Sequence, residues 1–201
     1  MKICHVVGAG DFAPHLLKTG KDDLIIAADA GYDHLRRAKI TPHLYIGDGD
    51  SLGFTPEGIE TVLLPTVKDD TDIHAAVKVG LSRGFRTFYI YGALGGKRFS
   101  HSLANLQVLS FLDQNGATGI LIDENYSVFL LNKGVHTFDF EKGYFSLFDF
   151  EGGAKVSVKG AKYPLEEASL PPFATLGISN EGEKNTTVTV HLGSVFVVRE
   201  P

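Results

Sequence analysis

Asp48 and Asp50 stand two residues apart, each preceded by a glycine, within residues 47–51. The apolar residues 44–46 come directly before, so if they form a strand, the acids lie at its C-terminal end, where open α/β sheets bind ligands. Side chains at i and i+2 of an extended segment point to one face, so both carboxylates can reach one divalent cation. Asp-Gly pairs are also common in turns. The segment alone leaves both a turn and a metal site open.

A second acidic cluster, residues 69–72, leads into a helix that we predict over residues 71–82. Asp70 or Thr71 can cap this helix, and acids in a first turn are favoured by its dipole, so this interpretation needs no function. Asp72, however, lies on the helix face that is expected to meet the sheet. An unpaired carboxylate is costly there unless it meets a cation.

A third acid, Asp29, follows the predicted strand 24–28 and precedes a turn of small residues. It therefore also occupies a ligand position at a strand exit. Carboxylate oxygens that leave coordination positions open for phosphate are typical of a Mg²⁺ site. Three unrelated acids that cap turns or helices remain the alternative.

The glycine-rich residues 92–98 connect a predicted strand to a predicted helix and end on two cations, Lys97 and Arg98. Exposed backbone amides, a helix N-terminus and two cations together favour phosphate binding. The segment is not a Walker A motif, because it lacks the required G-K-[ST] spacing. His101, at the start of the helix, is either catalytic or structural. We also predict that the glycine-containing residues 8–11 form a turn whose backbone can closely approach a nucleotide.

Composition excludes several classes of protein. Of the 201 residues, 43% are apolar and 21% are charged, which is ordinary for a globular protein. The net charge of −5 argues against an extended nucleic-acid surface. Cys4 is the single cysteine, so it forms no internal disulfide, and we expect a buried hydrophobe. Because we find no signal peptide and no apolar stretch of membrane-spanning length, we expect a cytoplasmic protein.

Strand-like apolar runs alternate with helix-like segments up to residue 124, and these elements must position the acids. Such alternation predicts βαβ units around a mostly parallel sheet that is buried on both faces. The predicted strands span residues 3–7, 24–28, 44–46, 61–64, 87–91 and 119–123. The predicted helices span residues 12–18, 32–38, 71–82 and 101–114.

From residue 125 onward the pattern changes to short strand-like runs joined by glycine-containing turns. These runs span residues 127–131, 135–140, 144–150, 154–158, 186–191 and 194–199. Their period-2 alternation predicts a small antiparallel β-sandwich or barrel. We therefore predict two domains, an α/β domain at residues 1–124 and a β-sandwich domain at residues 125–201.

Taken together, these motifs resemble those of the thiamin pyrophosphokinase family. The matching segments are Asp29-Ala30-Gly31 for D-G-G, residues 47–51 for G-D-x-D-S and residues 68–72 for K-D-x-T-D. Residues 95–105 resemble the family's glycine-basic-x-D-H-x-x-x-N segment, and residues 177–181 its G-x-S-N-E. Five motifs in the family's order, spread over both predicted domains, make the resemblance specific.

The resemblance implies an α/β nucleotide-binding catalytic domain joined to a β-sandwich that helps to bind thiamin. It implies a Mg²⁺-dependent enzyme that transfers pyrophosphate from ATP to the hydroxyethyl group of thiamin, giving thiamin diphosphate and AMP. It also implies a homodimer with the active site between subunits. Attack by a primary alcohol on the β-phosphorus needs alignment and charge neutralisation more than a strong protein base, which fits these residues.

The resemblance further assigns roles to individual residues. Mg²⁺ is expected at Asp29, Asp48, Asp50 and Asp72, the last three of which form the catalytic set together with Arg98. The expected ATP-binding positions are Asp29, Ser51, Lys68, Asp69, Thr71, Gly95, Gly96, Lys97, His101 and Asn105. Thiamin is expected at Tyr163, Ser179 and Asn180.

Three features depart from the family pattern. Ser100 replaces the family's Asp before His, Ala30 replaces the first glycine of D-G-G, and the chain has no Trp, whereas the family often carries one before S-N-E. Tyr163 stands where that aromatic is expected, and it either stacks on thiamin through cation–π attraction or is an aromatic of the sandwich edge. Two other functions stay open, a pyrophosphokinase acting on another hydroxymethyl heterocycle such as a pterin and a non-catalytic nucleotide- or thiamin-binding sensor.

Overall fold

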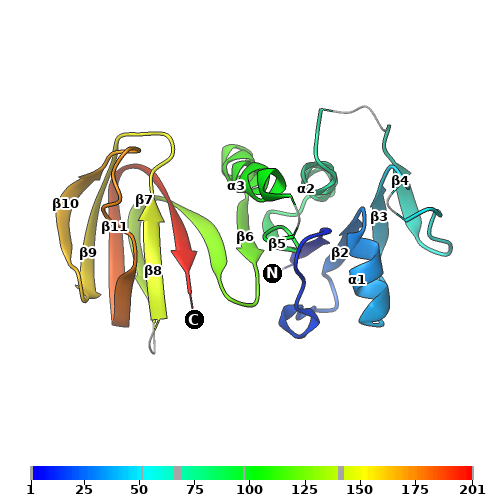
Figure 1. Ribbon diagram of the computed structural model, residues 1–201, viewed down its shortest axis with the longest axis horizontal. Helices are drawn as coiled ribbons and strands as arrows, with labels where there is room; N and C mark the ends of the chain where they lie inside the picture. The colour runs from blue at the N-terminus through cyan, green and yellow to red at the C-terminus, as the bar shows by residue number, and fades with distance from the viewer. Residues whose placement is uncertain (1, 51, 66–68, 97, 140–142, 201) are drawn as a thin grey trace. The chain divides into compact units, whose positions relative to one another are not determined.

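The computed structural model describes residues 2–50, 52–65, 69–96, 98–139 and 143–200. Ser51, Lys68 and Lys97 of the predicted site lie outside the described residues. The chain divides into two compact units, Met1–Glu124 and Asn125–Pro201, which can be followed by their colours in Figure 1. Within the described part of the chain, no helix combines the length and the apolar character needed to cross a membrane.

The first unit is built on a sheet with the strand order β6-β5-β1-β2-β3-β4, in which neighbouring strands are parallel. The strands are β1 (Cys4–Val7), β2 (Leu24–Ala28), β3 (Leu44–Gly47), β4 (Glu60–Leu63), β5 (Thr87–Tyr91) and β6 (Thr118–Ile122). The first three are buried along their whole length, as expected of strands that are covered on both faces. The predicted α/β fold with a mostly parallel sheet is confirmed.

Helices cover both faces of this sheet; they are α1 (Gly31–Arg37), α2 (Asp72–Ser82) and α3 (Phe99–Gln114). On one face α2 packs so closely that a β-carbon at Gly80 would lie 2.5 Å from the Phe88 ring and 2.9 Å from the Cys4 sulfur. On the other face, Leu35 of α1 packs in a buried cluster with Val7. Cys4 and Val7 lie on opposite faces of the sheet, because successive strand residues point to opposite faces. Burial raises the pKa of the Cys4 thiol to about 12, in keeping with the expected buried hydrophobe.

The helix predicted over residues 12–18 is wrong. Only Pro14–Leu16 forms a single 3-10 turn there. Ala13 is extended, with φ −105° and ψ 100°, because a residue before proline is driven away from the helical conformation. Leu17 is also extended. The helical conformation therefore ends after a single turn, before further hydrogen bonds can offset the cost of starting a helix.

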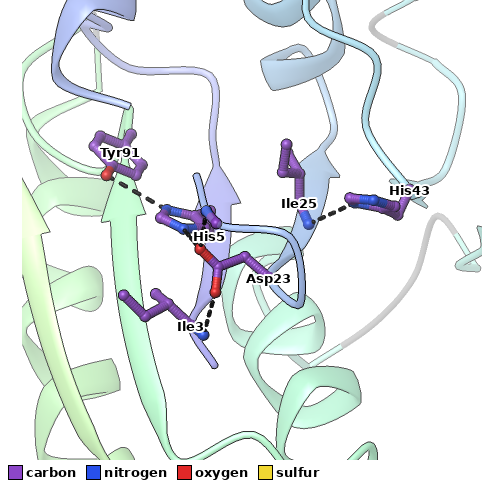
Figure 2. A network of polar contacts seen from close by, with 7 residues as sticks. Ile3, His5, Asp23, Ile25, His43 and Tyr91 are labelled. Carbon is purple, nitrogen blue, oxygen red and sulfur yellow. Dashed lines mark hydrogen bonds and ion pairs between the residues drawn. The ribbon is translucent and has the colours of Figure 1, made fainter. Parts of the chain in front are cut away.

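A buried polar network joins the amino ends of β1 and β2 (Figure 2). The Asp23 carboxylate accepts hydrogen bonds from the backbone amides of Ile3 at 2.7 Å and Gly20 at 2.6 Å. It also lies 3.2 Å from Nε2 of His5, whose Nδ1 lies 3.5 Å from the Tyr91 hydroxyl. Burial lowers the pKa of His5, although Asp23 opposes the shift. The network therefore satisfies a buried and mostly neutral histidine.

The second unit contains, among its described residues, the strands β7 (Ser127–Phe138), β8 (Gly143–Phe148), β9 (Ala154–Ala161), β10 (Leu165–Leu170) and β11 (Asn180–Arg199). The order β10-β9-β11-β7 is antiparallel throughout. Both ends of β11 also pair with β8. Alternating apolar residues such as Val156, Val158, Val188 and Val190 form the core. The predicted antiparallel strands at the C-terminus are confirmed.

Two strands of this unit each combine residues from two predicted runs. β7 includes the predicted run 127–131 and the start of 135–140, and β11 includes both 186–191 and 194–199. The register of β11 shifts between Val190 and Ser194, where Gly193 has a φ of 70°. A glycine that is typical of a turn in the sequence is thus part of a bulge within one continuous strand.

Candidate active site

A cavity of about 400 Å³ lies in the first unit at the carboxyl ends of its central strands. It is lined by the ends of β1, β2 and β5 and by the starts of α2 and α3. The lining residues are Gly8, Ala9, Gly10, Asp11, Ala28, Asp29, Thr71, Asp72, Ile73, Gly92, Ala93, Gly95, Gly96, Arg98, His101 and Asn105. This is the edge at which open α/β sheets bind ligands.

Two glycine turns form one wall of the cavity by packing backbone against backbone. The Gly10 amide donates to the Gly92 carbonyl at 2.8 Å, and the Asp11 amide donates to the Leu94 carbonyl at 3.1 Å. A β-carbon at Gly10 would lie 2.5 Å from the Leu94 carbonyl oxygen, so no other residue fits without a shift. The Asp11 carboxylate in turn accepts a bond of 3.3 Å from the Gly96 amide. Asp11 thereby holds the predicted phosphate loop.

Helix α3 fixes the same loop from its other side. The buried Asn105 donates from Nδ2 to the Ala93 carbonyl at 2.6 Å, and the Ser102 hydroxyl lies 3.4 Å from the Gly95 carbonyl. Asn105, predicted to bind ATP, therefore uses its amide to position the loop. Arg98 and His101 line the cavity next to it, where their side chains are available to an anionic ligand.

Asp29 is held in an unusual backbone conformation at the end of β2. Its φ is 51°, a left-handed value that is uncommon outside glycine and often marks a functional site. Its amide donates to the Ile46 carbonyl at 2.8 Å, and its carbonyl accepts from the Tyr32 amide at 3.1 Å. The backbone is therefore fixed at both ends, and the side chain is left to lie at the cavity wall.

Asp48 and Asp50 lie in a turn, and the extended segment considered above does not form. β3 ends at Gly47, and Gly49 has a φ of 80°. The Asp48 carboxylate accepts a bond of 3.1 Å from the Asp50 amide, the usual Asx-turn arrangement. Asp50 is exposed, and neither acid is among the residues that line the cavity. The segment forms the turn, and its role in a metal site stays a prediction.

Three of the predicted metal ligands act on one buried phenol. Tyr45, in β3, is fully buried, and burial, followed by the negative charge of Asp29, raises the pKa of its hydroxyl to about 12. The Gly49 amide opposes this shift, while Asp48 and Asp72 add to it. Charge effects of this kind weaken with distance. The Tyr45 hydroxyl and the Asp29 backbone meet at Gly47, where a β-carbon would lie 2.5 Å from the hydroxyl oxygen and 3.3 Å from the Asp29 α-carbon.

Two acids near the start of α2 have different surroundings, since Asp70 pairs with side chains of the helix and Asp72 lines the cavity. Thr71 caps the helix by accepting a bond of 3.2 Å from the His74 amide. Asp70 bonds to Lys78 at 2.7 Å and to His74 at 3.1 Å, and its hydrogen bond with Lys78 is the main reason that its pKa is lowered. Asp72 lines the cavity. Asp69 is exposed and lies outside the lining.

No three acidic, histidine or cysteine side chains of the described residues lie close enough together to hold a metal ion by themselves. Mg²⁺ is usually bound through one or two carboxylates together with the phosphates of the substrate. The carboxylates of Asp29 and Asp72 line the cavity beside the glycine loop. Their oxygen atoms are of the kind that binds Mg²⁺ together with phosphates. The four-acid Mg²⁺ site stays a prediction.

In the second unit, the predicted thiamin-binding residues lie side by side. The buried Asn180 accepts from the Tyr163 amide at 3.0 Å and donates to the Tyr163 carbonyl at 2.7 Å. Ser179, with a φ of 54°, donates its amide to the Ser146 hydroxyl at 3.0 Å. Tyr163 is 55% exposed, and Nζ of Lys162 lies 5.5 Å from the centroid of its ring, while Asn180 fixes its backbone.

Comparison with protein families assigns both units. The model described as thiamin pyrophosphokinase, catalytic domain, matches residues 16–121, and the model described as thiamin pyrophosphokinase, vitamin B1 binding domain, matches residues 132–197. The chain belongs to the thiamin pyrophosphokinase family. A comparison with curated protein sequences found no significant match.

Solved structures of this family share the fold of the whole chain. Thiamine pyrophosphokinase from Bacillus subtilis is 26% identical with a TM-score of 0.85, over 100% of this chain and 99% of that chain. A thiamin pyrophosphokinase family protein from Enterococcus faecalis is also 26% identical, with a TM-score of 0.84 and the same coverage. Thiamin pyrophosphokinase from Candida albicans, 18% identical over 98% of this chain and 89% of that chain, shares the fold with a TM-score of 0.79.

The structure explains one departure from the thiamin pyrophosphokinase motifs. Ala30, in place of the first glycine of D-G-G, has a φ of −62° and a ψ of −7°, which any residue adopts. Gly31 cannot be replaced in the same way, because a β-carbon there would lie 1.9 Å from the Val7 carbonyl oxygen. The motif therefore keeps the glycine that packing requires. Ser100 is exposed in α3, and nothing in the structure explains the replacement.

Two residues of the site were not among those predicted from the sequence. Asp11 was predicted only as part of a close-approach turn, and its bond to Gly96 spans 85 residues, which no local pattern indicates. Tyr45 gave a weak signal, since it lies on the same strand face as Gly47, two residues before the exit to the acids. A large polar side chain next to a glycine on one strand face is the pattern that would have found it.

Proposed function

We propose that the protein is a thiamin pyrophosphokinase, which transfers pyrophosphate from ATP to the hydroxyethyl group of thiamin and releases AMP. The observation that carries the proposal is the cavity of about 400 Å³ at the carboxyl edge of the sheet. A glycine loop, Arg98, Asp29 and Asp72 all line it, in a chain whose two halves match the catalytic and thiamin-binding models.

In this proposal the first unit binds ATP through its triphosphate. The Gly95 amide and the cations Lys68, Lys97 and Arg98 neutralise phosphate charge, while Gly96, whose amide donates to Asp11, shapes the loop. Ser51, Asp69, Thr71 and His101 are further contacts. Asp29, Asp48, Asp50 and Asp72 would hold Mg²⁺, which when bound supplies charge neutralisation to the triphosphate. Their carboxylate oxygens fit this ion, which prefers oxygen ligands and shares its coordination with phosphates.

The reaction joins the thiamin hydroxyl oxygen to the β-phosphorus and breaks the bond between that phosphorus and the bridging oxygen of AMP. The alcohol proton leaves late, to a site carboxylate or to water. Arg98 and the Gly95 amide stabilise negative charge as the bridging oxygen departs. The protein thus contributes alignment and electrostatic stabilisation, and a strong base is not required.

Thiamin is proposed to bind at the second unit, with the exposed ring of Tyr163 against a thiamin ring. Ser179 would offer a hydroxyl, and Asn180 would act mainly by fixing the Tyr163 backbone, since both atoms of its amide are bonded there. We also propose a homodimer with its active site between subunits, as the family resemblance implies, and a cytoplasmic location. Size-exclusion chromatography with light scattering tests the dimer.

The deciding experiment is incubation of the protein with ATP, Mg²⁺ and thiamin, with AMP and thiamin diphosphate measured as products. We expect equal amounts of the two products, and no thiamin diphosphate when Mg²⁺ is chelated. ADP as the product, or turnover that does not depend on thiamin, contradicts the proposal. Turnover with a hydroxymethyl pterin in place of thiamin indicates the related pyrophosphokinase, and nucleotide binding with no turnover indicates a sensor.

A further inference from the structure

The Tyr45 side chain is held rigidly at the carboxyl edge of the sheet. It is fully buried, and it belongs to the apolar cluster that includes Val7 and Leu35. Its ring packs edge-on against Tyr32, with centroids 6.0 Å apart at 79°. A phenylalanine would provide the same packing. The hydroxyl is therefore the part of this residue that packing leaves unexplained.

The Tyr45 hydroxyl makes no hydrogen bond of normal geometry within the described residues. A buried polar group without a partner is destabilising, so such groups are rare and call for an explanation. The oxygen nevertheless accepts a looser hydrogen bond from the Gly49 backbone amide, which opposes the rise in its pKa. An amide beside the oxygen leaves the O–H hydrogen available for donation to an acceptor.

The hydroxyl is directed at the acids. A β-carbon at Gly47 would lie 2.5 Å from the Tyr45 hydroxyl oxygen and 3.3 Å from the Asp29 α-carbon, so the phenol and the Asp29 backbone meet above the same glycine. Among the charges that act on the phenol, that of Asp29 is the largest, before those of Asp48 and Asp72. A carboxylate is the acceptor that a phenol O–H bonds most strongly.

We infer that Tyr45 is a positioning residue, whose hydroxyl donates a hydrogen bond to the Asp29 carboxylate when nucleotide and its cation occupy the site. Because the Asp29 backbone is fixed by bonds to Ile46 and Tyr32, the bond forms through side-chain rotation alone. It orients the second carboxylate oxygen toward the ligand, as outer hydrogen bonds orient metal-binding groups generally. The inference rests on the proposed function and assigns a role that none of the sequence motifs contains.

The test is the variant Tyr45→Phe, which removes the hydroxyl alone. Binding of Mg²⁺ with α,β-methylene-ATP, whose α–β bridge is not cleaved, is measured by calorimetry, and thermal unfolding is measured without ligand. We expect about tenfold weaker binding, which is the order of a hydrogen bond to a charged group. We expect an unfolding temperature of the ligand-free variant that is equal to or above that of the wild type, because the O–H hydrogen that is removed has no acceptor before the ligand binds.

Tyr91→Phe is the matched control, since Tyr91 is also a buried strand tyrosine but its hydroxyl lies 3.5 Å from His5. It should lower the unfolding temperature slightly and leave nucleotide binding within about twofold of the wild type. Analogue binding by Tyr45→Phe that matches the wild type overturns the inference. So does a fall in its ligand-free unfolding temperature as large as that of Tyr91→Phe, because the hydroxyl would then be bonded before ligand arrives.

A double-mutant cycle tests whether Tyr45 acts through Asp29. In an Asp29→Asn background, the loss of affinity on Tyr45→Phe should shrink to less than about threefold, whereas independent residues would give additive losses. Additive losses overturn the assignment of Asp29 as the acceptor. If the wild type binds the analogue but makes no thiamin diphosphate, the proposed function fails while this test still applies. If it makes thiamin diphosphate and Tyr45→Phe binds normally, the inference alone fails.

Discussion

The two ends of the parallel sheet differ in how fully their buried polar groups are hydrogen-bonded. At the amino end, the Asp23 carboxylate accepts two backbone amides and meets His5, whose other nitrogen faces Tyr91 (Figure 2). At the carboxyl end, the Tyr45 hydroxyl has no bond of normal geometry within the described residues, and Asp29 has a left-handed backbone. The polar groups at the amino end are hydrogen-bonded to one another and stabilise the fold. Those at the carboxyl end have hydrogen-bonding capacity that a ligand can use.

The largest expected effect comes from Asp29→Asn at the carboxyl end. We expect turnover to fall about 10²- to 10³-fold, the usual cost of removing one preorganised charge interaction from a reacting site. Stability should hardly change, because Asn is among the residues that best tolerate a positive φ. Release of AMP and thermal unfolding are measured together. Near-normal turnover at limiting Mg²⁺ would contradict a role in binding the metal and phosphates.

The same substitution at the amino end, Asp23→Asn, should have the reverse outcome. The carboxylate accepts bonds from Ile3 and Gly20 and contacts His5, so we expect a loss of about 2 kcal/mol in the free energy of unfolding. The kcat and the KM for ATP should stay within about twofold, since these contacts lie outside the cavity lining. Urea unfolding measures the change, with Asp22→Asn at the exposed neighbour as control. A loss of activity without a loss of stability would erase the contrast between the two ends.

A smaller effect is expected from pH. Burial lowers the pKa of folded His5 below its ordinary value of 6.5, so the unfolded chain binds more protons and stability falls as the pH drops below about 6.5. Burial raises the pKa of Asp23, but the Gly20 and Ile3 amides and His5 outweigh it, and the net lowering makes its contribution disappear as the pH falls below 3.8. His5→Gln keeps a donor toward Asp23 without a titrating ring.

We therefore expect His5→Gln to flatten the pH dependence of stability as the pH falls below about 6.5, in a series of urea unfolding curves. Its slope there should be lower than that of the wild type. Identical slopes would mean that His5 is protonated in the folded protein as readily as in the unfolded chain.

The parallel sheet was the most predictable part of the fold. Strands 24–28 and 87–91 were predicted with the bounds that the structure has, because continuous apolar runs between glycine turns are typical of strands buried on both faces. β10 (Leu165–Leu170) was missed, since its exposed glutamates hide the alternation and its register shifts next to Glu167, which has a φ of 41°. Edge strands are set by their partner more than by their own residues.

The candidate site was predictable to the extent that it depends on strand exits. Asp29 and Asp72 were predicted because an acid after a buried strand, or at a helix start beside the sheet, generally occupies a ligand-binding position in α/β folds. Tyr45 and Asp11 were not, because their roles depend on groups from other strands, Asp29 and Gly96. Contacts between distant segments leave no local pattern, and a residue that positions another is therefore the last to be found from sequence.

β11 has a consequence for the order in which the protein can acquire its structure during synthesis. This strand lies between β9 and β7 and also pairs with β8 at both of its ends, yet it is made after all of them. Until Arg199 has left the ribosome, the strands of the second unit have unpaired edges of the kind that favour association between chains. The strands of the first unit all precede Asn125. The first unit can thus be complete while the nascent second unit still needs protection, as domains commonly fold one after another.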